Sequence, residues 1–220
     1  MLQIPISEHF EMITMPSLKK KIIVLLSVIT ISTTPLTTAA ANEDTLKTTP
    51  LVELLNLKSA SFDSNLADFD IFTALFMDVW GLIPESDIQQ ITMGNDALTA
   101  FIPNDRAFRR LVTFLTGKTL NNESNIAMAV MNLGEETVES VLLYHIVPNV
   151  TISSDQALSS NGVALQSLSG DSFTVKVSGS TVTLVDKKSK HTNPIVLSAK
   201  ADLNAGNLQI AHGINQVLLP

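Results

Sequence analysis

The chain has 220 residues, of which 45% are hydrophobic and 16% charged, so it can bury a core and lacks the composition of a disordered chain. Its formal net charge of -7 argues against nucleic acid as a partner, because phosphate polymers are bound by concentrated positive charge. The chain contains no cysteine, which excludes disulfide scaffolds, thiolate metal sites and cysteine nucleophiles.

The N-terminus has the pattern of a secretory signal peptide. Three lysines at residues 19–21 precede an apolar run over residues 22–31, and three alanines follow at residues 39–41. The apolar run is shorter than the roughly 20 residues that a membrane span needs. We therefore predict an N-terminal extension and signal peptide over residues 1–41, and an exported domain over residues 42–220 without stable membrane insertion. The alternative is an uncleaved signal that remains as an anchor.

The first half of the exported part is predicted to be helical. Pro50 opens a short helix over residues 50–55, where its missing N–H group costs nothing. Residues 67–80 carry apolar side chains at spacings of three and four, which is typical of an amphipathic helix. Asn65 or Asp68 is the expected cap of this helix, and Gly81 its expected end.

A strand over residues 97–102 follows, and Pro103 ends it. Asn104 or Asp105 is then placed to cap a helix that runs to about residue 115, where Gly117 stops it. Two further helices are predicted over residues 126–133 and 136–144. The side chains that share one side of the second are Val138, Val141, Leu142 and His145.

After Pro148 the pattern changes to alternation of apolar and polar residues. Phe173, Val175 and Val177 alternate with polar residues, and a Ser-Gly-Ser turn at 178–180 leads into a return strand, so a hairpin is predicted. The remaining strands are expected over residues 195–199, 208–211 and 214–218. Helices first and strands later predict one α+β domain.

Two glycine-containing motifs resemble parts of enzyme active sites, but neither supports an enzymatic function. Gly117-Lys118-Thr119 has the end of a nucleotide-binding loop, but the spacing demands glycine where Val112 stands. Gly170-Asp171-Ser172 has the look of a hydrolase nucleophile turn, but an ordinary turn before a strand explains it.

The histidines of the exported part are His145, His191 and His212, and none has the spacing of a metal site. We therefore predict no metal, no cofactor and no catalysis. The basic run at residues 187–191 is predicted to be a solvated loop, with contact to an anionic polysaccharide or membrane surface as the alternative. Asn122 and Asn149 begin acceptor triplets for N-glycosylation, which export would permit.

Three segments, taken in order, resemble a known family. LTAFIPNDRAF at residues 98–108 contains the pattern T-x-F-x-P followed by a polar pair, LLYHIVP at 142–148 contains a tyrosine–histidine pair, and IAHGINQVLLP closes the chain at 210–220. Together they resemble the fasciclin-type (fasciclin I) domain of secreted and surface adhesion proteins. The resemblance implies an α+β fasciclin-like fold, with helices packed on a β-sandwich or wedge.

The resemblance also implies a function. It predicts a secreted, extracellular module for cell adhesion or matrix interaction that binds cell-surface or matrix proteins or glycans, in the periplasm or at the cell surface if export stops there. In animal relatives the corresponding segments are linked to integrin binding, which makes Tyr144, His145, Asp202 and Leu203 candidate partner-binding residues. The alternative for Tyr144 is a buried ring with a satisfied hydroxyl, and for His145 a buried hydrogen-bond bridge.

The sequence departs from the family in the last segment, where Gly213 replaces a larger apolar residue and Asn215 an acidic one. The alternative function is a carrier of an apolar ligand such as a carotenoid, as in some algal relatives, with methionines and phenylalanines lining a pocket. The oligomeric state stays open.

Overall fold

The structure is a computed structural model that describes residues 46–56, 62–188 and 191–220. The compact body of the chain comprises Asp44–Pro220. The predicted signal peptide over residues 1–41 lies outside the described residues.

A three-stranded sheet lies at the centre of the domain. Its middle strand β1 (Leu98–Pro103) pairs antiparallel with β2 (Ile146–Pro148) and parallel with β6 (Gln209–Ile214). All six residues of β1 and all six of β6 are buried. Such complete burial means that both faces of this sheet are covered, as in the interior of layered folds.

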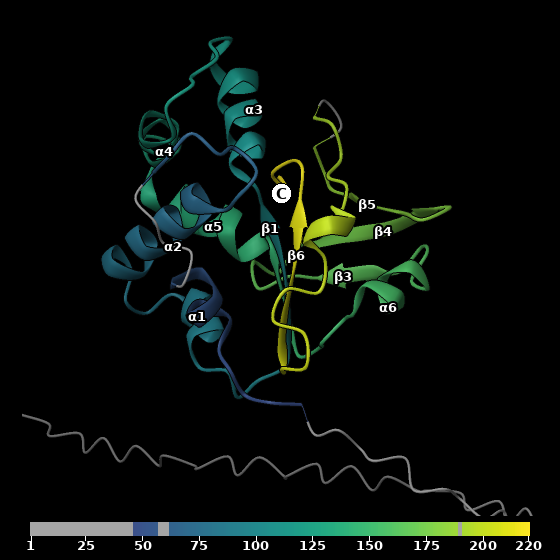
Figure 1. The fold of residues 1–220 in the computed structure, drawn as a ribbon. Coiled ribbons are helices and arrows are strands. Elements are labelled where there is room, and N and C mark those ends of the chain that lie inside the picture. The colour runs from purple at the N-terminus through teal and green to yellow at the C-terminus, as the bar shows by residue number, and fades with distance from the viewer. Residues whose placement is uncertain (1–45, 57–61, 189–190) are drawn as a thin grey trace, which may run out of the picture. The chain divides into compact units, whose positions relative to one another are not determined.

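Helices cover one face of the central sheet, on the left in Figure 1. Ala100 and Ile102 of β1 and Ala211 of β6 belong to the apolar cluster on this side. The elements that supply the rest of the layer are α1 (Leu51–Asn56), α2 (Asp70–Leu82), the 3₁₀ helix Asp87–Thr92, α3 (Asp105–Thr116), α4 (Glu123–Met131) and α5 (Glu135–Tyr144).

A second sheet, which is antiparallel, covers the other face of the central sheet. It contains β3 (Ala164–Gln166), β4 (Ser172–Ser178) and β5 (Thr181–Val185), with the short helix α6 (Ser154–Leu158) beside it in Figure 1. Phe101 of β1 meets Phe173 of β4 edge to face, with 5.6 Å between ring centroids. Both rings belong to a second apolar cluster to which the two sheets contribute. The predicted α+β fold is therefore confirmed.

The best-predicted element is α3. The Asn104 side chain accepts a hydrogen bond from the Ala107 N–H at 3.0 Å, and Gly117 ends the helix with a φ of 71°. The hairpin of β4 and β5 and the helices α1, α4 and α5 also lie where the sequence predicts them, within a few residues at each end.

Helix α2 differs from its prediction at both ends. It starts at Asp70, and its N-cap Phe69 makes no side-chain cap, so neither Asn65 nor Asp68 caps it. The Asn65 side chain instead binds the Ala67 N–H and the Asp68 carboxylate within the preceding loop. Gly81 lies inside the helix, because the Ile83 N–H donates to the Val79 carbonyl and closes one more turn.

The predicted C-terminal strands are wrong in detail. Residues 195–199 form only isolated bridges at Ile195 and Val196 before the 3₁₀ helix Ser198–Lys200. The strands expected over 208–211 and 214–218 are one strand, β6. His212 and Gly213, where the sequence suggested a break, lie inside this strand and pair with Phe101 and Ile102 of β1. After Ile214 the chain leaves the sheet.

Five short elements of the described chain were not predicted, namely β2, β3, α6 and the two 3₁₀ helices. Their three to six residues are too few for a periodic pattern. In the described part of the chain, no helix has both the length and the apolar character to cross a membrane.

The glycine at position 213 has a structural cause. A Cβ atom there would lie 2.7 Å from the Lys200 Cβ and 2.9 Å from the Phe69 Cζ. The Phe69 ring and the Lys200 side chain therefore fill the space that a larger residue would need.

We predict that Gly213→Val lowers the free energy of unfolding by about 1–3 kcal/mol through overpacking. Urea unfolding monitored by circular dichroism measures the effect. Gly81→Ala is the control, because no heavy atom lies within 4 Å of the new Cβ, and it should raise stability by up to about 1 kcal/mol. Wild-type stability of Gly213→Val would contradict the packing argument.

Candidate functional site

His145 is a buried bridge between α5 and the C-terminal segment. Its Nε2 accepts a hydrogen bond from the Leu218 N–H at 2.9 Å, so Nδ1 carries the proton that it shares with the Val141 carbonyl at 2.7 Å. Burial lowers the pKa of His145 to about 4, which leaves the ring neutral at physiological pH. The ring thus fixes the last residues of the chain against α5.

Tyr144 is completely buried on the other side of the same helix end. Its hydroxyl donates to the Ser172 carbonyl at 3.1 Å, and its ring meets Phe173 edge to face at 5.6 Å. Burial raises the pKa of Tyr144 to about 12. The alternative reading of Tyr144 and His145 as buried, hydrogen-bonded residues is therefore confirmed, and their part in partner binding stays a prediction.

Asp202 links the segment before β6 to the start of α6. Its carboxylate accepts hydrogen bonds from the Ser154 N–H, at 2.8 Å, and from the Ser154 hydroxyl. The Asp202 N–H donates to Nδ1 of His212 at 3.2 Å, and His212 Nε2 donates to the Ile152 carbonyl at 2.7 Å. Burial lowers the pKa of His212, so this chain of bonds contains a neutral ring.

Leu203, the fourth predicted residue, is half-buried and pairs with Ala211 through two backbone hydrogen bonds of 2.8 and 2.9 Å. Asp202 and Leu203 thus lie together beside α6. Tyr144 and His145 are buried in the interior, so the structure does not join the four side chains into one exposed site.

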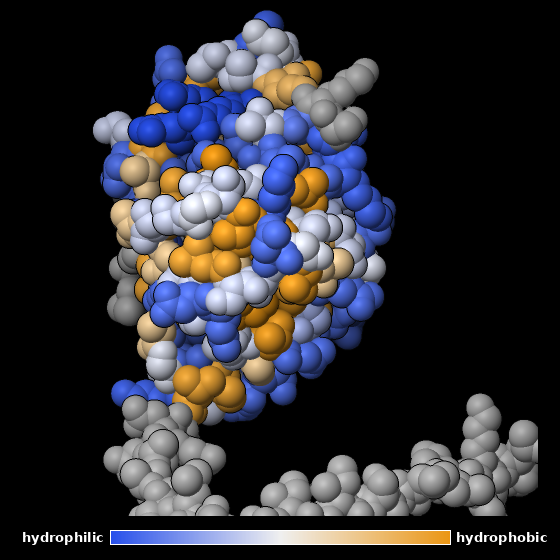
Figure 2. Space-filling view, turned by 90° about the vertical axis from the view of Figure 1, so that its right-hand side faces the viewer, coloured by the Kyte–Doolittle hydropathy of each residue, from blue (hydrophilic) through white to orange (hydrophobic). Residues whose placement is uncertain are grey.

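A hollow with mainly apolar walls lies on the surface beside α6. Its volume is about 590 Å³, and we call it the α6 surface. The residues that line it include Val150, Ile152, Asp155, Gln156, Val163 and Leu165. Val150 is 38% and Val163 45% exposed, and Figure 2 shows apolar side chains gathered on the face that carries α6 and the second sheet.

A second hollow, the helix pocket, lies between α3, α4, α5 and the C-terminal segment. It encloses about 290 Å³ and is lined almost entirely by apolar side chains. Those that form its walls include Leu75, Phe108, Leu111, Val138, Leu142 and Leu219.

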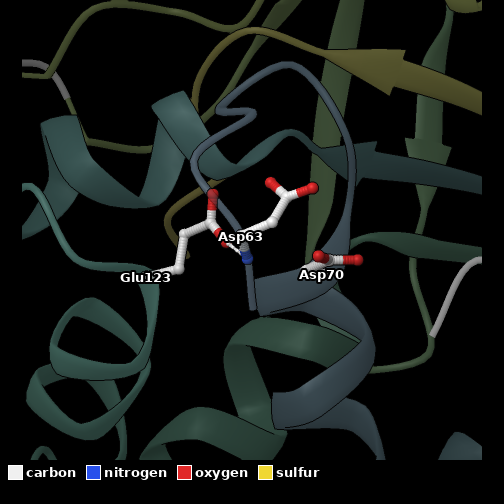
Figure 3. Close-up of side chains that lie close together, drawn as sticks. All are labelled: Asp63, Asp70 and Glu123. Carbon is white, nitrogen blue, oxygen red and sulfur yellow. Dashed lines mark hydrogen bonds between the residues drawn. The ribbon is translucent and has the colours of Figure 1, made fainter. Parts of the chain in front are cut away.

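Carboxylates gather where the loop over residues 62–69 meets the first turns of α2, α3 and α4. This acidic cluster comprises Asp63, Asp68, Asp70, Asp105 and Glu123. Figure 3 shows Asp63, Asp70 and Glu123 from three separate places in the chain. No histidine belongs to the cluster, so histidine spacing does not indicate it; the spacing D-x-N-x-x-D-x-D over residues 63–70 is the signal in the sequence that does.

The other motifs have structural places. Gly117 ends α3, and Gly170, with a φ of 86°, forms the turn before β4. Lys187 pairs with Asp171, while Ser189 and Lys190 of the basic run lie outside the described residues.

Both predicted glycosylation acceptors are exposed. Asn122 also caps α4 by accepting the Asn125 N–H at 3.0 Å, and Asn149 adopts a φ of 64°. Glycosylation at both stays a prediction.

Comparison with known proteins decides the family. The sequence model of the fasciclin domain matches residues 74–220, which is more than half of the chain and includes all three motif segments. The chain belongs to the fasciclin domain family. No curated protein sequence matches this fasciclin domain.

Among solved structures, the domain is similar to the FAS1 domain pair of the insect cell adhesion molecule fasciclin I, with 15% sequence identity and a TM-score of 0.49. The match covers 72% of this chain and 48% of that chain, so the chain spans about half of the length of that domain pair.

The lowered pKa of His145 predicts that the domain loses stability in acid. Its folded pKa of about 4 lies below its ordinary value of 6.5, so the unfolded state binds the proton first. The neutral ring contributes at most roughly 3 kcal/mol to the free energy of unfolding. This contribution is fully present above pH 6.5 and is lost as the pH falls towards 4. His145→Gln, which cannot titrate, should show a shallower decline between pH 7 and pH 4 in urea midpoints.

The control is His191→Gln. Burial also lowers the pKa of His191, but this ring is only half-buried. His191→Gln should therefore change the slope of urea midpoint against pH less than His145→Gln does. Parallel curves for the wild type and His145→Gln would contradict the prediction.

Proposed function

We propose that this fasciclin domain is an exported adhesion module that binds a cell-surface or matrix protein or glycan through the α6 surface. Fasciclin domains are generally linked to cell adhesion and occur in extracellular and cell-surface proteins. The observation that carries the proposal is the exposed apolar hollow bordered by polar residues, since such patches mark interaction sites.

The α6 surface is held in place before any partner arrives. Ser153 and Gln156 form a capping box at the start of α6, and Asp202 holds Ser154. A surface ordered in advance loses less conformational entropy on binding. Asp202 therefore contributes to binding by positioning α6, and it also lies at the edge of the neighbouring hollow with Gln156.

Binding rather than catalysis is also favoured by the surroundings of the three motif residues with titratable rings, Tyr144, His145 and His212. Tyr144, His145 and His212 point their polar atoms at backbone carbonyls and N–H groups of the interior. Their partners are structural, and their pKa shifts follow from burial. A single weak module gains strength when many copies are presented on one surface.

The test uses immobilised protein and cells of the source organism. Val163→Glu places a charge on the exposed apolar part of the α6 surface and should reduce cell retention at least about tenfold, which is the range of an interface hot spot. Met128→Glu is the matched control, because Met128 is 55% exposed on α4, away from this surface, and should retain cells as the wild type does. Equal loss in both variants, or in neither, would overturn the choice of surface.

The helix pocket supports a second candidate function, a carrier of an apolar ligand. Its volume lies near the lower limit of ligand pockets, so it suits a small apolar molecule or one end of a long one such as a carotenoid.

We predict that Thr137→Trp, which adds an indole at the pocket wall, weakens binding of an apolar fluorescent probe about tenfold, while Thr137→Ser leaves it unchanged. Fluorescence titration gives both affinities. Equal probe binding by all three proteins would count against the carrier function, and colourless native protein would exclude a bound carotenoid.

A further inference from the structure

The acidic cluster contains carboxylates that use only one of their two oxygens. Glu123 Oε2 accepts the Asp63 N–H at 2.7 Å, and Asp105 Oδ1 accepts the Ile71 N–H at 2.9 Å. Among the described residues, the other oxygens, Glu123 Oε1 and Asp105 Oδ2, have no hydrogen-bond partner. Bulk water does not reach them either, because both side chains are 0% exposed. Buried polar atoms are rarely left unpaired, so these atoms call for a ligand.

The same pattern occurs at two neighbouring carboxylates. Asp68 Oδ2 accepts the Asn65 side-chain N–H at 2.7 Å, while its Oδ1 is buried and unpaired. Asp70 Oδ2 is also buried and unpaired, in a side chain that is 5% exposed. Backbone and amide donors thus hold one oxygen of Glu123, Asp105 and Asp68 in place and leave the other available.

Within the described part of the chain, no cation forms an ion pair with the carboxylates of the cluster. Among residues 46–56, 62–188 and 191–220, the only ion pair joins Lys187 to Asp171, outside the cluster. Carboxylates gathered this closely must take up either protons or a cation.

The spacing of the oxygens suits calcium. Asp63, Asp70 and Glu123 each offer an oxygen, and these atoms all lie within 4.8 Å of one another; the set of Asp68, Asp105 and Glu123 does the same. Calcium–oxygen bonds of 2.3–2.6 Å place ligands on opposite sides of the ion at most about 5 Å apart, and calcium accepts carboxylate oxygens in a flexible arrangement.

We propose that the acidic cluster is a calcium-binding site in which Glu123 is the ligand common to both sets and Asp63, Asp68, Asp70 and Asp105 supply the remaining carboxylate oxygens. The ion joins the loop over residues 62–69 to the first turns of α2, α3 and α4. It therefore stabilises the helical layer and lies apart from the α6 surface.

One competing arrangement satisfies part of the cluster without a metal. A proton shared between Asp68 and Asp105 would pair their two free oxygens, but it would leave Glu123 Oε1 and Asp70 Oδ2 unpaired. The calcium site accounts for all four atoms.

The test measures the thermal unfolding of the full chain at neutral pH, in about 10 mM CaCl₂ or in EGTA at matched ionic strength. We expect calcium to raise the Tm of the wild type by about 5 °C or more. Glu123→Gln should lose the rise, and the exposed ligand variant Asp63→Asn should reduce it even if Glu123→Gln does not fold. Glu136→Gln, an exposed glutamate in the first turn of α5, should keep it.

Calorimetric titration of the wild type with CaCl₂ provides the second measurement, with saturation expected below about 1 mM as in extracellular calcium modules. No heat and no Tm change in the wild type would overturn the proposal in favour of the shared proton. An equal rise in Glu123→Gln and Asp63→Asn would place calcium elsewhere, and an equal rise with MgCl₂ would overturn the assignment to calcium. Cell retention by the α6 surface is measured separately, so either proposal can fail alone.

Discussion

The fold depends on the burial of β1 on both faces. Its parallel pairing with β6 brings the middle of the chain against its last residues, and neither strand has a face that water can cover. The sheet therefore needs a helical layer on one side and a second sheet on the other. Each remaining element is either part of one cover or a connection between the two.

Hydrogen bonds from polar side chains connect these layers. Apolar packing is not directional, so these bonds fix how the segments lie against each other. His145 fixes the C-terminal segment to α5, Tyr144 reaches the second sheet, and His212 joins Asp202 to Ile152. Each of these bonds ends on a backbone group, so each specifies one relative position of two segments. The network reaches the α6 surface at Ile152, whose carbonyl accepts the hydrogen bond from His212.

The helical layer meets a different constraint at its outer end. Asp63 and Glu123 are 60 residues apart, yet the Asp63 N–H binds the Glu123 carboxylate. The N–H of Asp105, at the start of α3, donates to the Asp68 carbonyl of the same loop. Charges concentrated in this way oppose folding unless they are neutralised. The acidic cluster and the α6 surface thus belong to opposite parts of the domain and serve separate roles.

Elements with local signals are predictable from the sequence alone. Asn104 and Gly117 mark the ends of α3, and the alternation from Phe173 onward marks the hairpin, because capping and strand pairing leave periodic or positional patterns. The three motif segments also indicated the family before any fold was known. The tertiary structure alone decided the length of β6, the short elements β2, β3 and α6, the burial of His145 and the gathering of the five carboxylates. These features depend on contacts between distant segments, and such contacts leave no periodic pattern in a single sequence.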